Sequence, residues 1–376
     1  MKPEAMIGRI MRELHRGHWE RPADPAWDSN IPVIYYEEAN HRGKAYRVPL
    51  VILRTQPCEW FRRSGCTMCN YALLAANQEK VTSANILNQV DWALEHLGSS
   101  TQYPYVLLSA SGSFLSDDEI DPETRLAVLD KLRRWGLKQL SFETRAEFAR
   151  DPVYLKELKK TFGGGISAGV GLESADDFIR NAILNKGLPR KILLDGLAGL
   201  REAGIEYYMY IILGKPFLTP AEDIRDTVAS VRFSFDNGGF MCIVFASNLQ
   251  PYTLNRYLWS QGRFIPPSLW SLLAVIKELG PDPGRRVALK GLTRDLPYAP
   301  PVVATTCPKC DERVVAAIRK WDYDRNIADV DAVWGQCDCF EKWKATLDGG
   351  ADGGIRERVE KGYRQAMAEL GLDVDK

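Results

Sequence analysis

Three cysteines lie close together in the first fifth of the chain, at Cys58, Cys66 and Cys69. Seven residues separate the first two, and two residues separate the second from the third. Thiolates are the usual ligands of iron–sulfur clusters, which normally take four of them. A zinc site would need a fourth cysteine or histidine, and this loop contains neither. The spacing therefore favours a [4Fe–4S] cluster with one open iron over a zinc knuckle or three unligated thiols.

An iron without a protein ligand can bind the amino and carboxylate groups of S-adenosylmethionine (SAM). An electron from the cluster then cleaves the sulfonium and gives a 5′-deoxyadenosyl radical, while the protein positions the reactants and excludes water. Abstraction of a hydrogen atom by this radical requires no general base. The chain has only 4 histidines, none beyond residue 96, and this scarcity does not count against such chemistry.

A second group of cysteines lies near the other end of the chain and consists of Cys307, Cys310, Cys337 and Cys339. Four thiolates without a histidine suit a closed tetrahedral site for structural zinc. A second iron–sulfur cluster is the main alternative, and four unligated cysteines are the other. Small units of this size often depend on a metal for stability.

Strand-like and helical patterns alternate in the chain between the two groups of cysteines. The fold that these elements form must position the cysteines. Six apolar runs occur at 48–53, 105–110, 139–142, 165–171, 207–213 and 241–246, with helical patterns between them. This alternation predicts an α/β fold with a parallel sheet and crossover helices. Six units indicate a partial TIM-type (β/α)6 barrel, in which chemistry lies at the carboxyl ends of the strands. The three-cysteine loop follows the first strand directly.

The remaining segments divide the chain around this barrel. We expect an N-terminal extension at 1–47 with a helix, the barrel at 48–285, and the four-cysteine unit with a terminal helix at 286–376. The first helix carries Arg9, Arg12 and Arg16 on one face, which fits a solvated surface slightly better than a contact with nucleic acid.

The overall charge and hydropathy limit which classes of function the protein could have. The 376 residues include 49 Lys and Arg and 49 Asp and Glu, so nucleic-acid binding would need a local patch. We find no apolar stretch of about 18 residues and no signal-peptide pattern. We therefore expect a cytoplasmic protein that does not contact a membrane.

Several segments resemble the radical SAM superfamily and, within it, the archaeosine synthase radical SAM subunit (RaSEA). Besides the cysteine loop they are 111–115, 143–148, 171–174, 185–187, 249–250 with Thr253, and 266–271. The four-cysteine unit, ending at Trp343, is also similar, and the resemblance covers about residues 48–345. The spacing of seven then two residues departs from the usual three then two and is shared by only some branches. The catalytic subunit of Elongator is a more distant likeness.

The resemblance implies a lyase-type enzyme that modifies a tRNA base. In that pathway a lysine is joined to a 7-deazaguanine nitrile in tRNA, and the radical enzyme breaks the lysine carbon–nitrogen bond to leave archaeosine. It also implies a partner enzyme that installs the modified base, and an electron donor. A radical SAM enzyme of small-molecule or natural-product biosynthesis is the second hypothesis. A non-catalytic, zinc-containing nucleic-acid-binding protein is the third.

Residues after the second strand are candidates for binding SAM. By resemblance, the segment with Ser111, Gly112 and Ser113 receives the methionine amino group. Glycine allows a close approach of the backbone to a ligand. The alternative is an ordinary turn before a helix capped by Asp117 or Asp118.

Further candidates lie beside the cysteines and after the third and fourth strands. Met68 and Tyr71 flank the last cysteine and could line the adenine, although Met68 fits simple loop packing equally well. Glu143 and Arg145 have the groups to bind ribose hydroxyls and a carboxylate, or to pair with each other. Glu173 ends the fourth strand and could reach ribose or substrate.

Three residues are candidates for contact with the substrate. Lys186 could contact the substrate or the SAM carboxylate, although a helix C-cap explains the neighbouring Gly187. Lys215 and Gln250 follow the fifth and sixth strands. A lone lysine after a strand is more often exposed than catalytic, so these candidates carry less weight.

Overall fold

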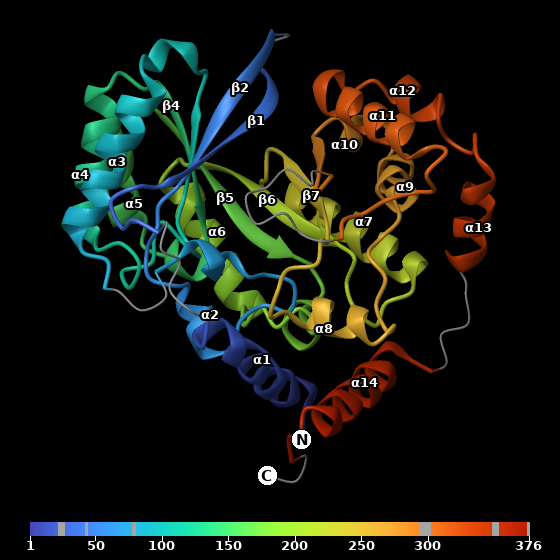
Figure 1. Cartoon of the computed structure of the whole chain (residues 1–376). Helices are drawn as coiled ribbons and strands as arrows, with labels where there is room; N and C mark the ends of the chain where they lie inside the picture. Colours follow the sequence, from blue (N-terminus) through green and yellow to red (C-terminus); the bar gives the residue numbers. More distant parts are fainter. Residues whose placement is uncertain (22–26, 42–43, 77–79, 293–301, 348–352, 374–376) are drawn as a thin grey trace.

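The fold is built around one sheet of eight strands that curls about a central axis (Figure 1). The computed structural model describes the chain except for residues 22–26, 42–43, 77–79, 293–301, 348–352 and 374–376. The strands are β1 (Val33–His41), β2 (Lys44–Ile52), β3 (Val106–Ser109), β4 (Gln139–Thr144), β5 (Gly165–Glu173), β6 (Glu206–Leu213), β7 (Cys242–Ala246) and β8 (Val287–Lys290). They pair in sequence order, and all neighbours are parallel except β1 and β2. The predicted α/β partial barrel is confirmed, with β2 to β7 as its six expected strands.

Two strands that the sequence analysis did not predict form the edges of the sheet. β1 lies within the expected N-terminal extension, and β8 lies within the expected C-terminal unit. The four residues of β8 are too few to show a periodic pattern. Lys290 Nζ lies 3.5 Å from Glu37 Oε2, so side chains of the two edge strands approach each other across the open side of the barrel.

Helices cover the outer face of the sheet. They are α3 (Ser83–Leu97), α4 (Pro122–Arg134), α5 (Pro152–Phe162), α6 (Arg190–Glu202), α7 (Pro220–Asp236) and α9 (Leu269–Leu279). Thr82, Asp121, Asp151 and Thr219 cap four of them by accepting hydrogen bonds from first-turn N–H groups. The side chains of alternate strand residues, such as Phe142, Val170 and Met209, are fully buried against these helices. The main core therefore lies between the sheet and its helical shell.

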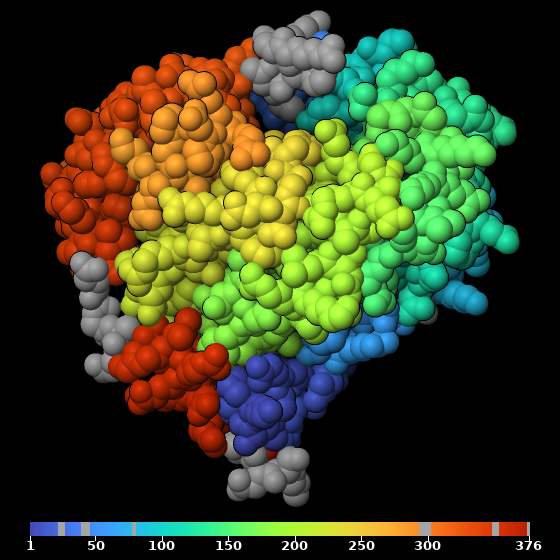
Figure 2. Space-filling model, turned by 180° about the vertical axis from the view of Figure 1, so that it is seen from behind, coloured from blue at the N-terminus to red at the C-terminus, as the bar shows by residue number. Residues whose placement is uncertain are grey.

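A second apolar core closes one end of the barrel. Helix α1 (Pro3–Trp19) packs there beside α14 (Ile355–Glu369), and Figures 1 and 2 both show these two helices side by side. Met6 and Ile10 of α1 share this core with Ile183, Leu184 and Tyr363. The segment between β5 and α6 contains a π-helical turn at Ile179–Ile183. The two chain ends thus cover the end of the barrel that carries the cysteine loop.

The four-cysteine unit lies at one side of the barrel and is mainly helical. It contains α11 (Asp311–Asp324), α12 (Ile327–Asp331) and α13 (Asp338–Leu347), and α10 (Pro281–Gly284) precedes it. Trp321 donates its indole N–H to the carbonyl of Val287, which joins α11 to β8 at 3.2 Å. None of the helices in the described part of the chain is long and apolar enough to cross a membrane.

Candidate active site

The three-cysteine loop lies over the carboxyl ends of the strands. Cys58 precedes the short helix α2 (Glu59–Arg63), and Cys66 and Cys69 follow it. Burial raises the pKa of Cys58 to about 11 and that of Cys69 to about 12. Without a bound cation, the thiols would therefore stay protonated at neutral pH. This environment suits a site whose metal supplies the charge that keeps them ionised.

The sulfurs of these three cysteines are spread more widely than a single metal ion requires. They do not all lie within 4.8 Å of one another, whereas zinc binds sulfur at about 2.3 Å. The N–H of Phe61 faces the Cys58 sulfur, and the N–H of Tyr71 faces that of Cys69. Hydrogen bonds to ligating sulfurs are a regular feature of iron–sulfur sites. The loop therefore fits a multi-iron cluster better than one zinc ion.

Asn185 anchors the cysteine loop to the segment after β5. Its side-chain N–H group donates to the Ser64 hydroxyl at 2.7 Å and to the Gly65 carbonyl at 2.6 Å. The Trp60 indole N–H in turn donates to the Asn185 carbonyl at 2.6 Å. Asn185 has φ 51°, in the left-handed region that asparagine tolerates better than most residues. A Cβ on Gly187 would lie 2.5 Å from the Trp60 ring, so only glycine allows this approach.

Helix α1 holds the outer side of the same loop. The His15 ring stacks on Phe61 with a centroid distance of 3.9 Å, and His18 meets the same ring edge-on at 4.9 Å. Gly65 has φ 85°, and a Cβ there would overlap the His15 ring. Burial lowers the pKa of His15 to about 4 and that of His18 to about 3, so both rings are neutral. Neither histidine was predicted from the sequence to have a role. The signal that could have indicated one was their position next to the apolar face of α1.

The turn after β3 contains three predicted residues and brings one of them, Gly112, against Cys58. A Cβ on Gly112 would lie 2.5 Å from the Cys58 sulfur, so glycine is needed for this approach. The Gly112 and Ser113 N–H groups donate to Glu119 at 2.8 and 3.0 Å. Ser113 is fully buried and its hydroxyl lies 2.6 Å from that of Thr144. Ser113 therefore supports the turn from inside the protein.

Glu119 is a site residue that the sequence analysis missed. Its carboxyl group also accepts from the Thr55 hydroxyl at 3.2 Å, and burial raises the pKa of Glu119 to about 7. The expected cap at Asp117 or Asp118 is wrong, because the side chain of Asp121 caps α4. Asp117 pairs with Arg125 instead. The turn before α4 is longer than a simple strand-to-helix connection, and Glu119 holds its backbone.

Glu143 and Arg145 point to different partners. Glu143 accepts hydrogen bonds from Ser109 and Tyr210, both at 2.5 Å. Arg145 pairs with Glu147 and donates to the Lys186 carbonyl at 2.7 Å. The alternative of an ion pair between Glu143 and Arg145 is therefore wrong. Successive residues of a strand face opposite sides, so Glu143 points away from the side on which Phe142 is buried, and Tyr210 reaches it from within the barrel.

Glu173 and Lys186 form an ion pair close to the cysteines. Lys186 Nζ lies 2.9 Å from Glu173 Oε1, and both side chains are nearly buried. Glu173 has φ 64° where the register of β5 shifts, so its backbone is strained. Burial raises the pKa of Cys66, and the positive charges of Lys186 and Arg145 oppose that effect. The pair thus places one carboxylate and one ammonium group beside the loop.

Met68, Tyr71 and Gln250 also lie in or beside the loop region. Met68 is buried in the second apolar core, and Tyr71 begins a 3-10 helix at Tyr71–Leu74. Asn70 donates to the Pro251 carbonyl at 2.7 Å, which ties the loop to the segment that contains Gln250. The side-chain N–H of Gln250 donates to Asn248 at 2.7 Å.

Several buried polar atoms around the loop have no partner. Among the residues that the structure describes, they include Ser111 Oγ, Thr67 Oγ1, Asn70 Oδ1 and Gln250 Oε1. Buried polar groups in proteins are nearly always hydrogen-bonded, so such a group of exceptions indicates a bound polar molecule or water. The donors and acceptors suit a ligand with amino, carboxylate and hydroxyl groups.

Lys215 belongs to a separate buried cluster. Its ammonium group lies 2.7 Å from Asp223, 3.0 Å from Asp226 and 3.0 Å from the Thr227 hydroxyl, all on α7. The side chain has no exposed surface. These contacts give Lys215 a structural role in joining the end of β6 to α7.

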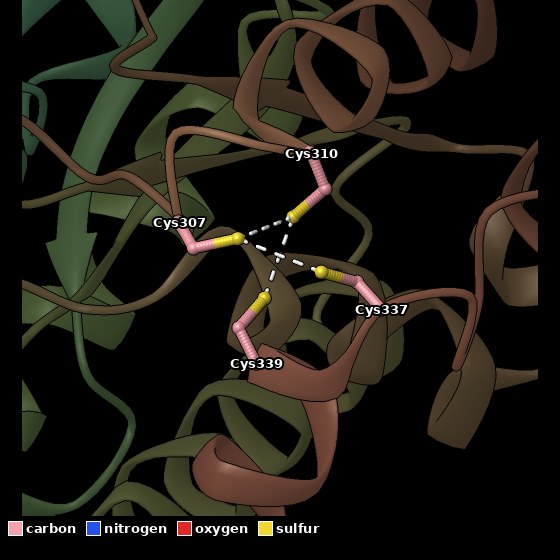
Figure 3. A group of neighbouring side chains, drawn as sticks. All are labelled: Cys307, Cys310, Cys337 and Cys339. Atoms are coloured by element: carbon pink, nitrogen blue, oxygen red, sulfur yellow. Dashed lines mark hydrogen bonds between the residues drawn. The ribbon is translucent and has the colours of Figure 1, made fainter.

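The four C-terminal cysteines converge on one point, as Figure 3 shows. The sulfur of Cys307 lies 3.6 Å from that of Cys310 and 3.5 Å from that of Cys337. Cys310 and Cys339 are 3.4 Å apart, and the Trp270 indole N–H donates to the Cys339 sulfur at 3.3 Å. All four sulfurs lie within 4.8 Å of one another. The predicted four-cysteine metal site is present as a compact, preformed set of ligands.

No protein-family model matches the chain. Archaeosine synthase subunit beta of Methanosarcina acetivorans is 26% identical over 306 residues, which cover 79% of this chain and 84% of the relative. The corresponding subunit of Thermococcus kodakarensis is 27% identical and covers 83% of this chain and 95% of its own length. The chain resembles archaeosine synthase subunit beta. The resemblance predicted from the sequence is therefore confirmed.

Other similar proteins include an uncharacterised one from Methanocaldococcus jannaschii, 28% identical over 67% of this chain and 70% of its own length. Among solved structures, Elp3 of Methanocaldococcus infernus has a TM-score of 0.45 and 16% identity, covering 72% of this chain and 62% of that one. A queuine lyase from Clostridium spiroforme, bound to SAM and queuine, has a TM-score of 0.42 and 19% identity, covering 58% and 83%.

We predict that Lys215→Met lowers the free energy of unfolding by about 3–5 kcal/mol, because Asp223 and Asp226 would stay buried without their counter-ion. Urea unfolding followed by circular dichroism measures this change. Lys191→Met removes an exposed ion pair with Asp195 and should change the value by less than about 1 kcal/mol. Normal stability of Lys215→Met together with weaker substrate binding would show instead that Lys215 serves the substrate.

Proposed function

We propose that this protein is a radical SAM enzyme whose [4Fe–4S] cluster is held by Cys58, Cys66 and Cys69. The observation that supports this most strongly is the loop itself: one buried and two partly buried cysteines, too widely spaced for one zinc ion, at the carboxyl ends of a partial barrel. When bound, the cluster and SAM supply a 5′-deoxyadenosyl radical. The unpartnered polar atoms around the loop support a polar ligand in the same place.

The residues around the loop divide the binding of SAM between them. The backbone of Gly112 lies against Cys58, where it suits the methionine amino group, and the unpartnered Ser111 hydroxyl precedes it in the same turn. Glu143 already accepts two hydroxyl donors, so its carboxylate is oriented to receive the ribose hydroxyls. Lys186 and Glu173 place opposite charges beside Cys66, which suits the methionine carboxylate and a polar group of SAM or substrate. Met68 and Tyr71 lie close to Cys69 in the chain, where they would line the adenine of SAM.

We further propose that the substrate is a tRNA base and that the reaction breaks the carbon–nitrogen bond of a lysine-modified 7-deazaguanine. The relatives named archaeosine synthase subunit beta support this assignment. The word subunit in these names also supports an assembly with a partner enzyme. An external reductant must supply the electron for each cleavage of SAM. In this proposal Gln250 lies on the substrate side, because one of its polar atoms is buried without a partner.

Single alanine substitutions at Cys58, Cys66 or Cys69 should each abolish both the cluster and the formation of 5′-deoxyadenosine, because each removes one of three ligands. Anaerobic reconstitution, iron analysis and chromatography of the SAM products measure the effect. Cys242→Ala is the matched control, since Cys242 is a buried core residue of β7. Wild-type protein that holds about four iron atoms but never cleaves SAM under reducing conditions would contradict the proposal.

We propose zinc at the four-cysteine site, because the sulfur separations of 3.4 to 3.6 Å suit one tetrahedral ion with bonds of about 2.3 Å. The triple variant Cys58→Ala, Cys66→Ala, Cys69→Ala removes the loop ligands and leaves this site intact. It should retain about one zinc per chain and no iron, and Cys310→Ala in that background should lose the zinc and lower the Tm. Bound iron with thiolate-to-iron absorbance in the triple variant would show a second iron–sulfur cluster instead.

A further inference from the structure

A cleft of about 720 Å³ lies on the outer side of the cysteine loop, between α1, α2 and the segment 181–189. Figure 2 shows this region at the lower edge of the molecule, where dark-blue α1 borders the lighter blue of the cysteine loop. Ala5 and Gly8 of α1 and Pro189 give the walls an apolar character, and Trp60 lines the cleft next to the loop. Pockets of this volume hold groups the size of a nucleotide.

Three arginines line the cleft. Arg12 is exposed, and Arg63 pairs with Glu59 while keeping 68% of its side chain exposed. Arg9 donates to the Asp373 carbonyl at 2.5 Å. Among the described residues that line the cleft, Glu4 is the acidic one. In a chain of zero net charge, this is the local positive patch that binding of a polyanion requires.

The structure separates the arginines that the sequence analysis grouped on one helix face. Arg9 and Arg12 line the cleft, whereas Arg16 pairs with Glu13 on the surface of α1. Arg12 and Arg16 are both exposed, as a solvated face requires, whereas Arg9 is half-buried and donates to the Asp373 carbonyl.

Trp60 connects the cleft to the candidate active site, because it lines the cleft and also contacts the residues that hold the cysteine loop. The Trp60 indole N–H donates to the Asn185 carbonyl, and the six-membered part of the same ring packs on Gly187. The Arg145 guanidinium lies 5.9 Å from the centroid of the same ring. A ligand in the cleft would thus contact the residues that fix Cys58 and Cys66.

We propose that this cleft binds a segment of the RNA strand next to the reacting nucleotide. The inference rests on the proposed function and adds the surface that recognises its substrate. Guanidinium groups match phosphate oxygens in a forked geometry, and an aromatic ring between apolar walls accepts an unstacked base. An acidic peptide would use the arginines but not the apolar walls around Trp60, so the combination favours RNA.

The test measures binding of a fluorescein-labelled tRNA transcript by anisotropy at several salt concentrations. Arg12→Gln and Arg63→Gln should each weaken binding and lower the log–log salt slope by about one, and the double variant should weaken binding roughly tenfold. Arg134→Gln is the matched control, because Arg134 is 74% exposed and paired on α4, outside the cleft. Iron content and Tm of the variants verify that they are folded.

Unchanged affinity and salt slope in the double variant would overturn the inference. So would a double variant that binds tRNA normally but no longer co-elutes with its partner enzyme, since the cleft would then bind protein. Conversion of lysine-modified tRNA by the wild type, read by nucleoside mass spectrometry, tests the proposed function separately. If wild type converts tRNA and the double variant binds it equally well, the function stands and the cleft assignment fails. If the double variant binds tRNA more weakly than the wild type, but the wild type does not convert lysine-modified tRNA, the cleft assignment stands and the proposed function fails.

Discussion

The hydrogen bonds of Asn185 fix the position of the cysteine loop, and the rest of the site depends on that position. Its side chain donates to Ser64 and Gly65, and its carbonyl accepts from Trp60, so one residue holds both α2 and the turn that follows it. The loop consists of the short helix α2 between two turns, and its apolar residues Phe61 and Met68 are buried. Helix α1 supports it from outside through His15 and Phe61, and the turn at Gly112 supports Cys58 from inside.

This arrangement has an electrostatic consequence. Burial raises the pKa of all three thiols, which opposes the ionised form that binds iron. Lys186 and Arg145 place two positive charges nearby, yet each also has a carboxylate partner, Glu173 and Glu147. The net local charge is therefore small, so a bound metal cluster would have to supply the charge that keeps the thiols ionised. The same water-poor surroundings suit an enzyme that must protect a radical.

The sequence predicted the barrel and the two cysteine groups well, because their signals are local. Parallel strands read as apolar runs, and metal-binding cysteines stand out by spacing. Other elements were less visible: β1 pairs with the neighbouring β2 inside the expected extension, whereas β8 depends on pairing with β7 and is only four residues long. Glu119 and His15 act through contacts with a loop more than 45 residues away in the chain. Lys215 follows a strand as predicted, but its neighbours on α7 show a structural role that spacing alone did not indicate.

The proposed function requires that the three-cysteine loop leave one iron open to bind SAM. Electron–nuclear double resonance of the reduced protein, mixed anaerobically with SAM labelled with ¹⁵N at the methionine amino group, detects such binding. We expect a ¹⁵N coupling that shows the amino nitrogen bound to iron, and the loss of this signal in Cys66→Ala. A reduced cluster whose spectrum is unchanged by SAM would show that no iron of the cluster binds SAM.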